Sequence, residues 1–160
     1  MIGDCKMLKI CRQYLQSNDT HTRLCADIDR DGEIKILWFE VEKKFAKYLL
    51  YERSDAFVIG LLQHAIQKGH DIVSEAPMTR RIYEQLTEQF MTCYNKMHGD
   101  FKTQKGAAVS ITVPLADEIS LVETGAVGTG ISCGVDSLHV FATHPEVSHA
   151  VMHVFGIFMV

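Results

Sequence analysis

The stretch from residue 125 to residue 160 constrains the fold most, because it reads as strand, tight loop, helix and strand in succession. Small and apolar residues over 125–131 predict a buried strand, and the polar residues 132–137 predict a loop. An amphipathic segment over 138–142 then predicts a helix, and the apolar run over 149–160 predicts a second parallel strand. Two parallel strands joined through a helix form a βαβ unit.

The predicted loop between strand and helix is suited to an anion. The N–H groups of a helix's first turn have no partner within the helix, and the helix dipole adds partial positive charge there. A small residue such as Gly134 lets a phosphate approach the backbone. The hydroxyls of Ser132 and Ser137 can add hydrogen bonds, and Asp136 can cap the helix or hold a magnesium ion.

The residues of this loop resemble the PP-loop signature of the ATP pyrophosphatase superfamily, which is written Ser-Gly-Gly-x-Asp-Ser. The matching positions are Ser132, Cys133, Gly134, Val135, Asp136 and Ser137. Every position but one fits, and Cys133 stands where the signature has the first of its two glycines. Such a motif has meaning only between a strand and a helix, which is the context predicted here.

The resemblance implies a protein that binds ATP and Mg²⁺ and adenylates a carbonyl or carboxylate acceptor with release of pyrophosphate. It implies that Asp136 and Ser137 are catalytic, that Asp136 holds the metal, and that the nucleotide is bound by Ser132, Cys133, Gly134, Val135, Asp136 and Ser137. The implied partner is a small-molecule acceptor, and a homo-oligomer remains open.

The predicted fold class is α/β, with an α+β N-terminal module followed by the first βαβ of a doubly wound parallel sheet. We expect an N-terminal segment over 1–19, the α+β module over 20–115, a linker over 116–124 and the start of a nucleotide-binding domain over 125–160. A doubly wound sheet needs further βα units to cover both faces. We therefore expect this chain to be a truncated N-terminal portion of such a protein.

Within the N-terminal part, apolar residues at roughly helical spacing predict a helix over 1–17. Two runs that alternate at period two, 20–29 and 33–42, flank Asp31-Gly32, which predicts a β-hairpin. The remaining expected elements are a helix over 54–68 that is capped by Ser54 or Asp55 and ended by Gly69, a strand over 71–77, a helix over 79–97 and a strand over 107–115.

A serine hydrolase is the first alternative, because Gly130, Ser132 and Gly134 also satisfy Gly-x-Ser-x-Gly. Ser132 would then be the nucleophile, with Glu146 as the acid and a base from among His139, His144, His149 and His153. The continuation through Asp136 and Ser137 favours the PP-loop instead. The second alternative is a truncated remnant without catalysis.

Two further patterns have structural explanations. Residues 27–34 fit the start of an EF-hand calcium loop, but Trp38 stands where the bidentate Glu is needed, which favours a hairpin turn with solvated aspartates. His149 and His153 can share one face, but a lone pair of histidines is more often structural than metal-binding.

Composition limits the remaining classes. The net charge of −4 gives no basic footprint for nucleic acid. No apolar run reaches the length of about 18 residues that a membrane helix needs, and the N-terminus lacks a secretory signal. The five cysteines are scattered without Cys-x-x-Cys spacing, which is typical of reduced thiols in a cytoplasmic protein.

Overall fold

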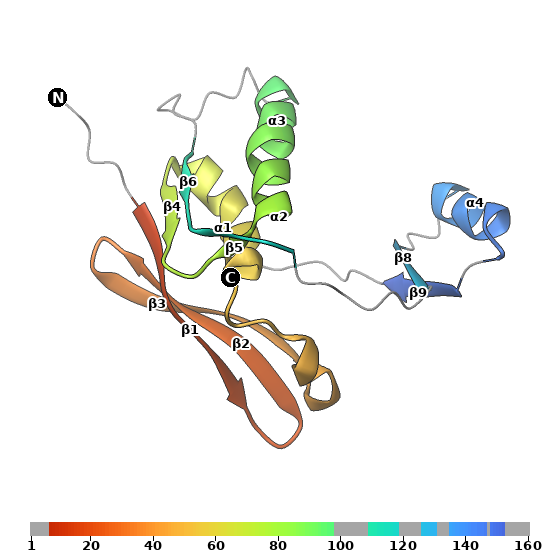
Figure 1. Ribbon diagram of the computed structural model, residues 1–160, viewed down its shortest axis with the longest axis horizontal. Helices are drawn as coiled ribbons and strands as arrows, with labels where there is room; N and C mark the ends of the chain where they lie inside the picture. The colour runs from red at the N-terminus through yellow and green to blue at the C-terminus, as the bar shows by residue number, and fades with distance from the viewer. Residues whose placement is uncertain (1–6, 98–108, 119–125, 131–134, 147, 153–160) are drawn as a thin grey trace. The chain divides into compact units, whose positions relative to one another are not determined.

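The protein has a mixed α/β fold, as predicted from the sequence (Figure 1). The computed structural model describes residues 7–97, 109–118, 126–130, 135–146 and 148–152. The chain divides into two compact units, Met1–Glu118 and Ile119–Val160.

A five-stranded mixed sheet forms the centre of the first unit, in the order β3-β2-β1-β4-β6 (Figure 1). Three long strands pair antiparallel through two hairpins: β1 (Met7–Ser17), β2 (His21–Arg30) and β3 (Glu33–Glu42). The short strands β4 (Asp71–Ser74) and β6 (Ile111–Thr112) continue the sheet parallel to β1.

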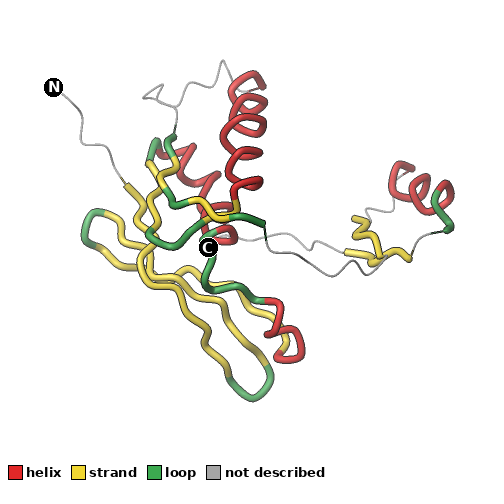
Figure 2. The backbone as a smooth tube through the Cα atoms, in the orientation of Figure 1, coloured by secondary structure: helices red, strands yellow, loops and turns green. Residues whose placement is uncertain are grey.

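The helices of this unit come before and after β4 in the chain. The tube view draws them in red against the yellow strands (Figure 2). The 3₁₀ helix η1 (Lys43–Tyr48) and helix α1 (Asp55–Lys68) precede β4. After it come strand β5 (Met78–Thr79) and the predicted helix over 79–97. That helix is confirmed as α2 (Arg80–Glu84), a π-helical turn η2 (Gln85–Phe90) and α3 (Met91–Met97).

The core lies between α1 and one face of the sheet. Helix α1 contributes Phe57, Val58, Leu62, Ala65 and Ile66, which recur at the spacing of one helical face. From the sheet come alternating residues of the strands, as expected for a sheet with one buried face: Leu8, Ile10, Leu24, Ala26, Ile28, Ile72 and Ile111.

The predicted hairpin at Asp31-Gly32 is confirmed. Both residues have positive φ, 57° for Asp31 and 87° for Gly32, as the two central residues of a type I′ turn require. The Gly32 N–H donates to the Asp29 carboxylate at 2.8 Å. Of the three aspartates that fit a calcium loop, Asp29 and Asp31 thus belong to this turn.

The predicted helix over 1–17 is wrong where the structure describes it, since Met7–Ser17 is strand β1. Leu8 and Ile10 alternate into the core, but the register with β2 then shifts between Ile10 and Gln13. A bulge of this kind adds a residue to one strand, so the apolar residues after it are no longer in phase with those before it. The bulge interrupts the alternation of apolar and polar residues, and the resulting spacing resembles that of a helix.

The predicted strand over 107–115 is also wrong in part. Residues 107–108 lie outside the described residues, and the rest forms two short strands, β6 in the main sheet and β7 (Leu115–Ala116), which pairs with β5. Pro114 lies between them, and a proline has no N–H for a sheet ladder. Its carbonyl accepts from the Met78 N–H at 2.8 Å, which directs the chain to β5.

Helix α1 begins and ends where predicted, but its N-terminus is held differently. Ser54 occupies the N-cap position without a side-chain capping bond, and its hydroxyl donates to the Pro77 carbonyl at 3.3 Å. The Asp55 carboxylate accepts from the Thr79 N–H and hydroxyl, each at 2.8 Å. These two side chains therefore tie α1 to β5 instead of capping the helix.

Gly69 ends α1 in the left-handed conformation, with φ 66°, and its N–H donates to the Ala65 carbonyl. No atom would lie within 4 Å of an added Cβ, so a substitution here meets only backbone strain. We expect Gly69→Ala to lower the free energy of unfolding by about 1 kcal/mol. Gly69→Asn is the control, because asparagine tolerates this conformation better; urea denaturation should rank Asn between Gly and Ala. An alanine variant as stable as the parent would contradict this account.

The second unit contains the predicted βαβ arrangement. Strand β8 (Ala126–Gly130), helix α4 (Val135–Thr143) and strand β9 (Ser148–Met152) follow one another, and the two strands pair parallel. Their register runs from Ala126 opposite Ser148 to Gly130 opposite Met152.

Candidate functional site

The candidate site lies at the carboxyl end of β8. This strand ends at Gly130, and α4 begins at Val135, so the segment between them joins the end of a parallel strand to a helix N-terminus. Ligands of open α/β sheets bind at the carboxyl ends of the strands, and the N–H groups of the first helical turn attract anions there. The described strand and helix therefore flank the position at which such sites bind anions.

The structure places half of the predicted site residues. Val135, Asp136 and Ser137 form the first turn of α4, whereas Ser132, Cys133 and Gly134 lie outside the described residues. Val135 is 84% exposed, and Asp136 is also exposed. Within the part of the chain that the structure describes, these two side chains are open to a ligand.

Helix α4 begins earlier than predicted, at Val135 instead of Leu138. Asp136 and Ser137 are consequently residues of the helix rather than of a loop before it. An acidic side chain in the first turn interacts favourably with the helix dipole, which helps to explain the earlier start. Asp136 thus belongs to the turn whose N–H groups have no partner within the helix.

The residues of the alternative serine hydrolase are separated by the topology of the unit. Glu146 and His144 lie together after α4, with 3.3 Å between the His144 Nδ1 and a carboxylate oxygen of Glu146. They precede β9, so they lie at the amino end of the parallel strands, whereas Ser132 follows the carboxyl end of β8. The nine residues of α4, about 13 Å of helix, run between the two ends. This arrangement argues against Glu146 and His144 as partners of Ser132.

The other histidines add no site in the described residues. His139 is an exposed residue of α4, whose carbonyl accepts from the Thr143 hydroxyl at 2.8 Å. His149 is in β9 opposite Val127, and His153 lies outside the described residues. Across the described ranges, no group of three or more His, Cys, Asp or Glu side chains is placed to hold a metal ion.

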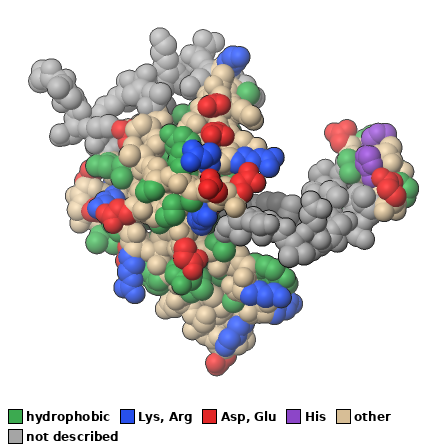
Figure 3. Space-filling view, in the orientation of Figure 1, with side chains coloured by type: hydrophobic (Ala, Val, Ile, Leu, Met, Phe, Trp, Pro, Cys, Tyr) green, Lys and Arg blue, Asp and Glu red, His purple; other side chains and the backbone are tan. Residues whose placement is uncertain are grey.

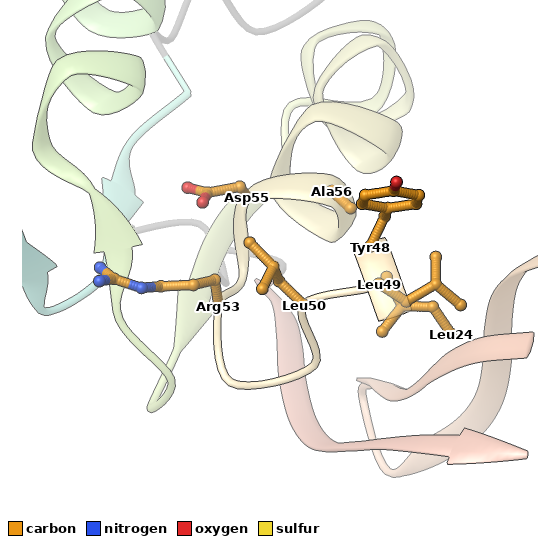
Figure 4. Close-up of a pocket in the computed structure, with 7 residues that line it drawn as sticks. All are labelled: Leu24, Tyr48, Leu49, Leu50, Arg53, Asp55 and Ala56. Carbon is orange, nitrogen blue, oxygen red and sulfur yellow. The ribbon is translucent and has the colours of Figure 1, made fainter. Parts of the chain in front are cut away.

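A separate cavity of about 240 Å³ opens in the first unit (Figure 4). It is lined by Leu24, Tyr48, Leu49, Leu50, Arg53, Asp55 and Ala56. Figure 4 shows the charged groups of Arg53 and Asp55 pointing away from Leu24 and Tyr48. Arg53 Nη2 donates to the Asp117 carbonyl at 3.1 Å, and Asp55 is bound to Thr79. The cavity is therefore mainly apolar and unsuited to a phosphate.

The buried cysteine of the first unit, Cys25, is not an activated nucleophile. Cys25 is 1% exposed, and burial raises the pKa of its thiol. A raised pKa keeps the thiol protonated at neutral pH, and the protonated form is the unreactive one. This leaves the start of α4 as the candidate site that the sequence and the fold both favour.

Comparison with protein-family models, with curated proteins and with solved structures finds no match to this chain. None of the helices within the described ranges combines the length and apolar character needed to cross a membrane. Function must therefore be inferred from the residues and their placement.

Proposed function

We propose that the second unit binds ATP with Mg²⁺ at residues 132–137 and acts as a PP-loop protein that adenylates a small-molecule acceptor. The observation that supports this most is the start of α4. Asp136 lies in the first turn of a helix that follows a parallel strand, with Val135 before it and Ser137 after it in the same turn. The strand and helix that the motif requires are thus present on both sides of it.

Each residue has a distinct part in this proposal. The backbone N–H groups of residues 133–136 bind the phosphates, and the hydroxyls of Ser132 and Ser137 add hydrogen bonds. Mg²⁺ in nucleotide sites is held by one or two carboxylates together with the substrate phosphates, so the single carboxylate of Asp136 fits that requirement. When bound, Mg²⁺ neutralises charge on the departing pyrophosphate.

The reaction proposed for this site is transfer of AMP. An oxygen of the acceptor's carbonyl or carboxylate group attacks the α-phosphorus of ATP, and the bond from that phosphorus to the pyrophosphate oxygen breaks. A nitrogen or sulfur nucleophile then displaces AMP from the activated carbon. The N–H groups of α4 would contribute by stabilising negative charge as pyrophosphate leaves. Such a reaction belongs in the cytoplasm, where ATP is available.

Isothermal calorimetry with ATP and MgCl₂ tests this proposal. We expect the chain to bind ATP, to lose that binding when Mg²⁺ is chelated, and to bind at least as well after Cys133→Gly, because glycine leaves more room for the phosphates. Cys93→Gly, at an exposed cysteine of the first unit, should leave the affinity unchanged. Binding by neither the parent chain nor Cys133→Gly would contradict the proposal. Binding by Cys133→Gly alone would mean that Cys133 has abolished the function in this protein.

A further inference from the structure

The segment from Lys43 to Tyr51 exposes several large apolar side chains. Tyr48 is 69% exposed, and large apolar side chains at three neighbouring positions are each more than two-fifths exposed: Phe45, Leu50 and Tyr51. Single exposed apolar residues are normal, but a contiguous patch of them marks an interaction surface. We name this segment, residues 43–51, the η1 surface.

Lysines accompany these rings in a regular way. In a 3₁₀ helix, residues three apart lie above one another, so Phe45 and Tyr48 share one edge of η1 and Lys44 and Lys47 share the next. The Lys44 ammonium lies 4.9 Å from the centre of the Phe45 ring, and that of Lys47 lies 5.0 Å from the centre of the Tyr48 ring. The rings of Phe45 and Tyr48 therefore each have a cation beside them.

Residues 42–53, which include the η1 surface, carry a net positive charge, whereas the whole chain is negative. Residues 42–53 include four cationic and two acidic side chains, in a protein whose net charge is −4. Glu42 is paired with Lys44 at 2.8 Å, and this hydrogen bond lowers the pKa of the Glu42 carboxyl. Lys43 and Lys47 form no ion pair with any residue that the structure describes. Both are free to bind an anionic partner. In Figure 3, Lys and Arg side chains gather beside hydrophobic ones near the lower end of the first unit.

The cavity of Figure 4 lies directly behind this surface. Tyr48, Leu49 and Leu50 belong both to the η1 surface and to the cavity lining, which also includes the buried Leu24. Apolar surface therefore continues inward from the exposed rings.

We propose that the η1 surface docks the protein onto a lipid bilayer that carries anionic headgroups. Its exposed rings project from the protein, and tyrosine and phenylalanine rings are favoured at the depth of the lipid headgroups. Lysines beside them can extend their ammonium groups to the lipid phosphates while their stems cover apolar surface. The contact involves one short segment, so it is peripheral and reversible. It concerns the first unit and does not depend on ATP binding.

Sedimentation with vesicles tests this inference. We expect more protein to bind vesicles of phosphatidylcholine mixed with phosphatidylserine than vesicles of phosphatidylcholine alone, and we expect added salt to reduce the difference. Lys43→Glu and Lys47→Glu should each lower the partition coefficient by at least roughly fivefold. Tyr48→Ser should lower it as well. The matched controls are Lys35→Glu and Ile36→Ser on β3, where a lysine and an apolar residue are also exposed; they should bind like the parent.

A fluorescence measurement then locates the contact. Trp38 is the only tryptophan, so a Trp38→Phe, Tyr48→Trp double variant reports on position 48 alone. Its emission should shift to the blue with phosphatidylserine vesicles, provided that circular dichroism shows a folded protein. Three results would each overturn the inference. They are vesicle binding that does not depend on phosphatidylserine, an equal loss of vesicle binding in the β3 controls, and an unshifted tryptophan emission at position 48. Binding to soluble polyglutamate but not to vesicles would also overturn it and would identify an acidic protein surface as the partner.

Discussion

Replacing Phe57 by alanine should lower the free energy of unfolding of the first unit by about 3–5 kcal/mol. Phe57 has no exposed surface, and its ring centre lies 5.8 Å from that of Phe39 across the interface between α1 and β3. Removing the ring takes away its burial and leaves a cavity that close-packed neighbours cannot fill completely. Urea denaturation followed by circular dichroism measures the change as a lower midpoint.

Ile59→Ala is the matched control, because Ile59 lies on the same helix and is 50% exposed. The Ile59→Ala substitution should lower the free energy of unfolding by no more than about 0.5 kcal/mol, as for a surface substitution. Helix propensity barely distinguishes the two sites, since both variants introduce alanine. Equal losses at positions 57 and 59 would show that the face of α1 against the sheet has been assigned wrongly.

Features of the first unit that depend on neighbouring residues could be predicted from the sequence. The Asp31-Gly32 turn follows from the ability of these residues to adopt positive φ, and the end of α1 follows from the same property of Gly69. These signals lie within a few residues of the structure that they determine. They are independent of the rest of the chain.

Features that depend on distant pairing could not be predicted in this way. Strand β1 lies between β2 and β4, and its parallel partner β4 comes more than fifty residues later in the chain. The bulge after Ile10 hides the alternation that would have identified a strand. Similarly, β6 and β7 belong to different sheets because Pro114 interrupts the ladder, which the alternation of Val109, Ile111 and Val113 does not reveal.

The same distinction applies to the sites. The succession of strand, motif and helix could be predicted because the three are contiguous in the sequence, although α4 begins three residues earlier than predicted. The cavity could not, since its lining comes from β2, from the end of η1 and the residues after it, and from the start of α1. The η1 surface could not be recognised from the sequence, because lysines and aromatic residues over 43–51 do not show by themselves whether the rings are buried. The exposure of these rings in the folded unit provides that information.

Asp136→Ala should remove most of the Mg²⁺-dependent affinity for ATP, by at least roughly 10- to 100-fold, and should abolish ATP turnover if an acceptor is found. Removing a residue that only orients a metal ligand typically lowers metal affinity about 10- to 100-fold, and Asp136 would be a direct ligand. The substitution should not unfold α4, because the carboxylate contributes only about 0.3–1 kcal/mol through the helix dipole. Calorimetry with ATP, with and without MgCl₂, measures the loss.

Two controls make this result specific. Asp117→Ala removes a carboxylate that is 98% exposed in the first unit and should leave ATP binding unchanged, which separates a local effect from a change in net charge. Asp136→Asn keeps the size of the side chain but removes the charge, so it should bind ATP as poorly as alanine does in the presence of Mg²⁺. Full affinity in Asp136→Asn would mean that the charge is not required and that the metal is held elsewhere. Full affinity in both variants would contradict the assignment of the PP-loop, because no other described carboxylate lies in the first turn of α4.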